Sequence, residues 1–140
     1  MNRIAINGRF VTQGTTGVQR YAREMVREVD ALLTRDESLR RRYQFDLLVP
    51  PAGTTPLAAT HIRPLSVGHL KGQAWEQLEL PRHTGKRQLL NLCNTAPLAG
   101  RGIVTIHDAS VFVVPGAYSL PFRSWYRILL PYIGKRALMV

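Results

Sequence analysis

The sequence contains almost no cysteine. Cys93 is the single cysteine among 140 residues, so an internal disulfide framework is excluded. It follows the apolar residues 89–92, which predicts a buried, unreactive thiol rather than a nucleophile. Because nothing in the cysteine content requires an oxidising compartment, we expect a cytoplasmic protein.

Long apolar runs are also missing. No stretch of about eighteen apolar residues, the length that a membrane-spanning helix needs, occurs anywhere in the chain. The first residues lack the apolar core of a secretion signal. We therefore expect neither a membrane span nor export.

Acidic residues are scarce. Nine Asp and Glu stand against nineteen Lys and Arg, which gives a formal net charge of +10. This excess fits a nucleic acid, an anionic membrane surface or an acidic ligand. The basic residues are scattered, and no helix-turn-helix, zinc-finger or RNA-binding signature is present, so we expect no nucleic-acid partner. The one dense run, residues 40–42, lies in a polar connector and predicts a solvated loop.

What is present indicates an α/β domain. The chain opens with an apolar run at residues 3–7, a loop with three glycines, and an amphipathic stretch at 18–33, which is typical of strand, loop and helix. Thr15 or Thr16 would cap this helix. Its predicted buried stripe consists of Val18, Ala22, Met25, Val26, Val29, Leu32 and Leu33.

The same rhythm continues along the chain. Further strands are expected at residues 45–49, 61–65, 89–92 and 103–106, with a loop at 53–56 and a short helix at 75–80 ended by Pro81. We predict a Rossmann-like, mostly parallel sheet with helices on both faces. The positions expected inside are Ile4, Ile6, Leu47, Val49, Leu90, Val104 and Ile106.

The first loop carries Gly8, Gly14 and Gly17 in front of the helix. Backbone N–H groups at a helix N-terminus attract phosphate and other anions. The segment from Gly14 to Gly17 lacks the glycine spacing of the dinucleotide fingerprint and the Lys-Ser/Thr pair of a P-loop. Two interpretations are open: a phosphate-binding loop, or glycines that only permit a tight turn and close helix packing.

Polar residues follow two other strands. In parallel sheets, ligands bind beyond the carboxyl ends of the strands. Asn94 and Thr95 follow the strand at 89–92, and His107 and Asp108 follow the strand at 103–106, so we expect both pairs to face the same cleft as Gly17. Alternatively, the backbone satisfies His107, and Asp108 caps a turn or helix. The remaining histidines, His61, His69 and His83, have no metal-ligand spacing, and we expect no metal site.

Taken together, several segments resemble the N-terminal half of family 4 glycosyltransferases, especially bacterial polysaccharide and mannosyltransferase-like members. These segments are Asn7-Gly8-Arg9-Phe10, residues 16–24, Trp75-Glu76-Gln77, residues 91–97, residues 105–109 and residues 122–127. The likeness covers nearly the whole chain.

The resemblance implies a GT-B enzyme that transfers a hexose from a nucleotide sugar, with retention of configuration, to a glycan or lipid-linked acceptor. Residues 1–140 would form its acceptor-side domain, with no tightly bound cofactor. Gly14 and Gly17 would lie near the donor phosphates or the acceptor. By the same resemblance, His107 would contact the transferred sugar or the reaction centre.

The chain departs from the family in one respect. Residues 137–140 are expected to begin a strand, and the nucleotide-sugar domain of the family does not follow them in this sequence. We therefore expect that these residues alone do not catalyse sugar transfer. Two alternatives stay open: a non-catalytic sugar- or phosphate-binding module, and an unrelated α/β binding protein, including one for nucleic acid.

Residues 118–136 combine aromatics at helical spacing with positive charge. Such a helix is typical of a membrane interface, and we expect Trp125 and Arg127 to contact an anionic membrane or the acceptor at the inner face of the membrane. The alternative is that its apolar face packs on the sheet or under a further domain. Pro131 is expected to kink or break this helix.

Overall fold

Five parallel strands form one sheet in the order β3-β2-β1-β4-β5. The computed structural model describes residues 1–51, 57–108 and 110–140, so the predicted loop at 53–56 and residue 109 lie outside the described residues. The strands are β1 (Asn2–Asn7), β2 (Tyr43–Val49), β3 (Ile62–Ser66), β4 (Gln88–Asn91) and β5 (Gly102–Val104). This arrangement confirms the predicted Rossmann-like α/β fold.

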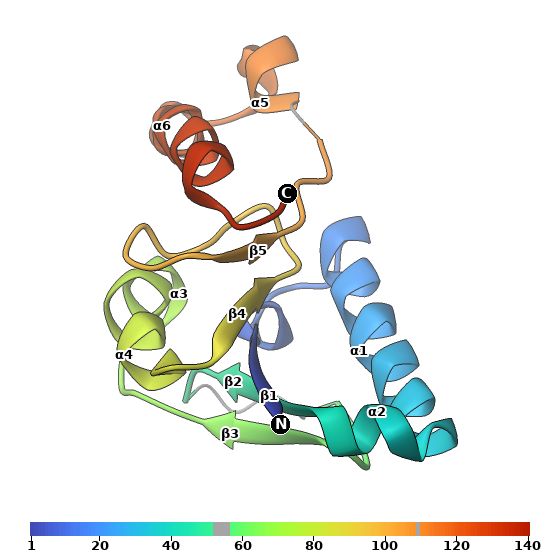
Figure 1. The fold of residues 1–140 in the computed structure, drawn as a ribbon. Coiled ribbons are helices and arrows are strands. Elements are labelled where there is room, and N and C mark those ends of the chain that lie inside the picture. Colours follow the sequence, from blue (N-terminus) through green and yellow to red (C-terminus); the bar gives the residue numbers. More distant parts are fainter. Residues whose placement is uncertain (52–56, 109) are drawn as a thin grey trace.

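Helices cover both faces of the sheet (Figure 1). On one side lie α1 (Gly17–Arg35) and α2 (Glu37–Arg42), and on the other lie α3 (Gly72–Ala74) and α4 (Leu80–Thr84). The alternation of side chains along the strands explains the two layers. Ile6 and Leu47 are buried with α1, whereas Ala5 and Leu48 are buried with the helical segment of α3 and α4. Pro64 lies in β3, at the edge of the sheet, where a missing backbone donor is tolerated.

Helix α1 (Gly17–Arg35) matches the predicted helix, but its buried stripe is narrower than predicted. Ala22, Val26 and Leu33 are buried. Met25 and Leu32, expected inside, are 37% and 50% exposed. They lie on the flank of the helix, and contact with a sheet reaches only the middle of an apolar stripe.

The basic run at 40–42 belongs to a helix, not to the predicted loop. Helix α2 (Glu37–Arg42) begins after Asp36, whose carboxylate accepts hydrogen bonds from the backbone amides of Ser38 and Leu39. Arg40 donates to the Thr34 carbonyl at 2.9 Å and so caps the end of α1. The prediction rested on the polar composition of this segment, which is typical of a loop. The helix forms nevertheless because the Asp36 carboxylate caps its first turn.

The short helix was predicted to stop at Pro81, and this prediction is wrong. Segments α3 (Gly72–Ala74), η2 (Trp75–Glu79) and α4 (Leu80–Thr84) follow one another directly. The η2 segment is a π-turn, in which the Leu80 amide donates to the Trp75 carbonyl. This wider turn lies just before Pro81 and accommodates a residue that has no N–H to donate.

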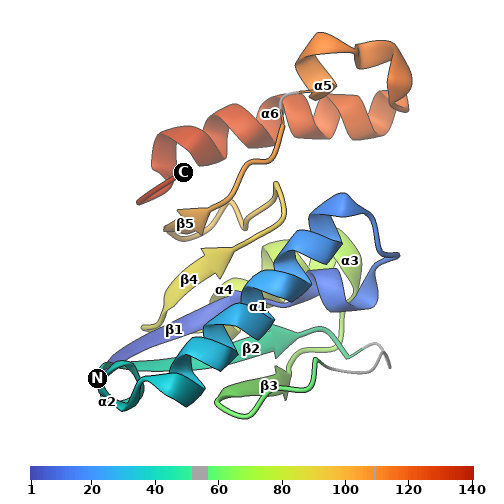
Figure 2. The ribbon, with the colours of Figure 1, turned by 90° about the vertical axis from the view of Figure 1, so that its right-hand side faces the viewer.

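The chain continues through α5 (Ser110–Val113), η3 (Pro115–Ala117) and α6 (Leu120–Arg136). Helix α6 lies alongside β5, and its Leu129 and Ile133 are buried against Val104 (Figure 2). The predicted break at Pro131 does not occur, since α6 runs across it as one helix. Pro131 is exposed, so water can solvate the carbonyl that it leaves without a donor.

Strand β5 is shorter than predicted. Ile106 lies beyond its end, half-buried against the α6 cluster, and Ile4 and Leu90 are also only half-buried. The other four predicted core positions, Ile6, Leu47, Val49 and Val104, are buried. Met139 forms an isolated parallel bridge with Ile103, in line with the strand expected at 137–140.

Across residues 1–51, 57–108 and 110–140, no helix is both long enough and apolar enough to cross a bilayer.

Candidate functional site

A pocket lies where the winding of the sheet reverses. Strands β1 and β4 are neighbours, but the chain leaves β1 toward α1 and enters β4 from α4 on the opposite face. At such a point the two connecting segments separate beyond the strand ends and leave a crevice. A pocket of about 520 Å³ is lined there by residues after β1, β4 and β5 and by residues of α5 and α6.

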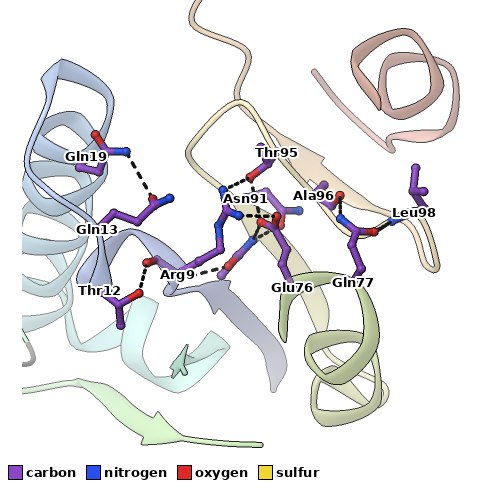
Figure 3. A network of polar contacts seen from close by, with 11 residues as sticks. Arg9, Thr12, Gln13, Gln19, Glu76, Gln77, Asn91, Thr95, Ala96 and Leu98 are labelled. Carbon is purple, nitrogen blue, oxygen red and sulfur yellow. Dashed lines mark hydrogen bonds and ion pairs between the residues drawn. The ribbon is translucent and has the colours of Figure 1, made fainter. Parts of the chain in front are cut away.

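A buried polar network lies beside this pocket and reaches its lining through Arg9 (Figure 3). Asn7, at the end of β1, donates to Glu76 Oε1 at 2.6 Å and to Asn91 Oδ1 at 3.0 Å. The Thr95 hydroxyl donates to the same Glu76 oxygen at 2.8 Å. Arg9 Nη1 lies 3.4 Å from Glu76 Oε2, and the Arg9 guanidinium also donates to Thr95. The network therefore joins β1, η2 and β4.

Glu76 is fully buried, and the Arg9 side chain is only 8% exposed. A carboxylate taken out of water is stable only when it is paired and hydrogen-bonded, and both oxygens of Glu76 have partners. Gln73 completes the arrangement: oriented to satisfy both ends of its amide, it donates to Glu76 Oε2 and accepts from Arg9 Nη1. Glu76, Thr95 and Gln73 fix the Arg9 guanidinium at the edge of the pocket.

The pocket has an apolar side and a polar side. Residues of α5, α6 and the turn before α6 supply the apolar side, namely Val111, Tyr118, Phe122, Tyr126 and Leu130. Three of these rings are stacked, with centroids 5.2 Å and 4.2 Å apart from Tyr118 to Phe122 and from Phe122 to Tyr126. The loops after β1, β4 and β5 and the start of α1 supply the polar side, which includes Arg9, Gln13, Gln19, Asn94 and Asp108.

The positive charge of Arg9 is compensated by Glu76, whereas Asp108 brings a negative charge to the pocket. Hydrogen bonds from the side chain and backbone of Ser110 lower the pKa of Asp108, so this carboxylate is ionised at neutral pH. Burial raises the pKa of Tyr126 and the nearby Arg9 guanidinium only opposes the rise, so the phenol stays protonated as a donor. Because Glu76 already neutralises Arg9, the pocket favours a hydroxylated ligand over a highly charged one.

Gly14 and Gly17 are exposed beside this pocket, next to the lining residue Thr16. A Cβ atom at either position would meet nothing within 4 Å, and neither backbone has a positive φ. A Cβ on Gly8 would lie 2.4 Å from the Leu48 carbonyl oxygen. Close packing therefore explains Gly8, but neither packing nor turn geometry explains Gly14 and Gly17.

His107 lies near the pocket but does not line it. Its ring Nε2 is 2.8 Å from the Leu92 carbonyl oxygen, and its backbone N–H donates to Asn94 at 2.6 Å. Its ring also packs edge-on against Tyr21, with centroids 4.6 Å apart. Tyr21 lies one turn of α1 beyond Gly17. Since a carbonyl can only accept, Nε2 of His107 is the donor in this contact.

The other predicted site residues have different surroundings. Asn94 lines the pocket with a φ of 48°, a left-handed conformation that asparagine tolerates. Asp108 lines the pocket and also accepts from Ser110 at the start of α5. Thr95 is 2% exposed, and the network occupies its hydroxyl. Catalytic and ligand-binding roles for these residues and for His107 stay predictions.

Trp125 and Arg127 do not share a surface. Trp125 is half-buried against the cluster that contains Val104 and Leu129. Its indole nitrogen is buried with no partner among the described residues. Arg127 is exposed on the outer side of α6. Trp125 thus belongs to an apolar face that packs on the sheet, which was the alternative to membrane contact. The outer side of α6 carries other apolar residues, Leu120 and Ile128.

Sequence reasoning did not single out Arg9, Glu76 or Tyr126 as site residues. The sequence carried a signal for Glu76, because it stands next to Trp75 in a short segment that is predicted to be helical. An acidic side chain is rarely buried beside such a residue unless it is paired. Cys93 also borders the pocket, and burial raises the pKa of its thiol to about 12, which makes it a poor nucleophile. No cluster of His, Cys, Asp or Glu fit to hold a metal ion occurs among the residues described.

Comparison of the chain with protein-family models, with curated proteins and with solved structures finds no match.

Proposed function

We propose that this chain is the acceptor-side domain of a nucleotide-sugar-dependent glycosyltransferase, and that the pocket at the β1/β4 crevice holds a hexose unit of a glycan or lipid-linked acceptor. The observation that carries the proposal is the two-sided lining of this pocket. An apolar side built on Phe122 and Tyr126 lies together with a side of amide and carboxylate groups.

A pyranose ring matches this lining. Its C–H groups form an apolar face, and its hydroxyl groups both donate and accept hydrogen bonds. Gln13, Gln19 and Asn94 can do both in return, and the ionised Asp108, whose Oδ1 accepts from Ser110, can accept from a sugar hydroxyl as well. A few placed polar groups in a largely apolar cavity are the usual composition of a small-molecule site.

The loop before α1 supports the second half of the proposal. Glycine is favoured where a ligand must approach the backbone closely, and Gly14 and Gly17 have no other structural reason to be glycine. In the proposed enzyme this loop faces the diphosphate of the nucleotide sugar, which a second domain binds. Residues 1–140 by themselves would transfer no sugar, because the cationic groups that stabilise the leaving diphosphate supply the largest part of such catalysis.

The experiment is a titration of the ¹⁵N-labelled chain with methyl hexopyranosides, followed by NMR. We expect shifts of the amides around Gln13, Asn94 and Asp108 for at least one sugar. Asp108→Asn and Phe122→Ala should weaken this binding about tenfold, while the matched surface variant Glu37→Gln should not. Absence of binding by every sugar, or shifts confined to another surface, would overturn the proposal. Binding without any transfer once a nucleotide-sugar domain is joined would favour the non-catalytic module.

The outer side of α6 favours peripheral membrane association as an additional role. Leu120 and Ile128 are each 66% exposed, and Arg127, Lys135 and Arg136 are exposed on the same helix. Apolar residues beside cations are typical of a helix that lies in an anionic membrane interface.

A further inference from the structure

One buried carboxylate, Asp46 in the middle of β2, lies within reach of three arginines. Asp46 on β2 is fully buried, and Arg63 of β3 donates to its Oδ1 from Nε at 3.1 Å and from Nη2 at 2.9 Å. Arg87, just before β4, donates to Oδ2 at 2.7 Å. Arg3 of β1 reaches the same oxygen only at 4.0 Å. Asp46 thus offsets one of three positive charges.

The arginines around Asp46 differ in how many of their N–H donors have an acceptor within the protein. Arg87 is 17% exposed, and each of its three nitrogens has an acceptor, on Asp46, the Thr84 carbonyl or the His83 carbonyl. Arg3 is 56% exposed and makes only its long contact to Asp46 within the described part of the chain. Its planar fork of N–H donors is therefore free to bind a ligand.

Arg3 faces a groove of about 680 Å³ beside the start of β1. Gly85, with a φ of 59°, forms the turn after α4 that brings Lys86 and Arg87 to the same groove. No acidic side chain is among the described residues that line it, and the Lys86 ammonium has no partner among them. A concave surface with uncompensated positive charge concentrates anions.

We infer that this groove binds a phosphate or diphosphate group, with the Arg3 guanidinium and the Lys86 ammonium as its ligands. Arginine matches the oxygen spacing of a phosphate with two parallel N–H donors, and lysine adds a point charge. Arg87 forms part of the wall of the groove, where its ion pair with Asp46 fixes it. The amides of Asn2 and Gln88, which also line the groove, can donate to remaining phosphate oxygens.

This site goes beyond the proposed function. The groove lies where β1 begins, whereas the pocket lies where β1 ends, and Figure 2 shows these two ends on opposite sides of the molecule. A nucleotide sugar in the β1/β4 crevice cannot supply this phosphate. The groove is thus a second site, and its occupation does not depend on whether the pocket binds a sugar.

The test is calorimetric titration of the chain with pyrophosphate at constant ionic strength. We expect binding that Arg3→Gln and Lys86→Gln each weaken about tenfold, since each removes one charged ligand. Lys71→Gln and Arg35→Gln remove an exposed charge elsewhere and should leave the affinity unchanged. Circular dichroism should show all four variants folded, because Arg3 and Lys86 are largely exposed.

A second arm distinguishes a free phosphate compound from a lipid headgroup. Vesicles containing phosphatidic acid replace pyrophosphate in a sedimentation assay with the same variants. Loss of vesicle binding in Arg3→Gln, with weak binding of pyrophosphate, would assign the site to a headgroup. The inference is overturned if neither probe binds, or if the two control variants weaken binding as much as Arg3→Gln does.

Discussion

Asn7 and Glu76, which are 69 residues apart in the sequence, are joined by a 2.6 Å hydrogen bond from the Asn7 amide to Glu76 Oε1. This bond joins the end of β1 to the π-turn η2, which covers the face of the sheet opposite α1. Since Glu76 also pairs with Arg9, the same carboxylate holds a cation at the edge of the pocket. Fold stability and the shape of the site thus depend on one buried group.

Replacement of this carboxylate should be costly. Glu76→Gln keeps the size of the side chain but leaves the buried Arg9 without a counter-charge, so we expect a loss of about 3 to 5 kcal/mol in the free energy of unfolding, measured with urea. Glu37→Gln breaks the exposed pair with Arg41 and should change it by less than about 1 kcal/mol. Equal effects of the two variants would contradict a supporting role of the network.

Glycine at position 17 should be dispensable for folding. Gly17→Ala places a methyl group in open space at the first residue of α1, and we expect a gain of about 0.4 to 1 kcal/mol from the restricted unfolded chain. In a protein joined to a nucleotide-sugar domain, the same change should weaken donor binding. Gly8→Ala, whose Cβ would collide with Leu48, should lower the melting temperature instead. A destabilised Gly17→Ala protein would show a structural need for this glycine.

His107 can be tested for a chemical role apart from its structural one. His107→Ala should reduce sugar transfer by such a two-domain protein at least about tenfold. His107→Gln retains a donor for the Leu92 carbonyl but removes the imidazole. If Gln restores full transfer, the ring only supports the loop and His107 is not part of the reaction centre.

Acid should weaken the link between α1 and β3. Burial raises the pKa of Asp30, but hydrogen bonds from the backbone amides of Thr60, His61 and Ile62 together lower it below its ordinary value of 3.8. The stabilisation is therefore complete above that value and is lost as the pH falls through the lowered pKa. We expect Asp30→Asn to be less stable at pH 7 and to lose less stability than the natural protein below pH 4. Parallel stability curves for the two proteins would exclude this contribution.

Membrane association should depend on the outer side of α6. A larger fraction of the chain should sediment with anionic vesicles than with neutral ones. This fraction should fall as added salt shortens the screening length to about 8 to 10 Å. Arg127→Gln and Ile128→Ser should release it, with Arg41→Gln as the matched control. Trp125 is unsuitable for this test because it packs inside. Equal binding to both vesicle types, or none, would leave α6 as an ordinary packed helix.

Much of the fold was predictable because its causes are local. An apolar run, a loop and an amphipathic stretch specify β1 and α1 within the first 35 residues, and the later apolar runs repeat the pattern. The order of strands and loops then places Asn94 and Asp108 beside the loop of Gly17. These side chains could be located because the carboxyl ends of parallel strands always meet at one edge.

The sequence by itself determined the fold class, the positions of most strands and the edge of the sheet where polar side chains gather. Only the tertiary structure decided that Pro81 and Pro131 lie within continuous helices, that Met25 stays exposed, and that Glu76 pairs with Arg9. The reason is that periodicity and capping act within a few residues, whereas burial depends on which surfaces meet. Partners as distant as Asn7 and Asn91, 84 residues apart, meet only after the sheet has formed.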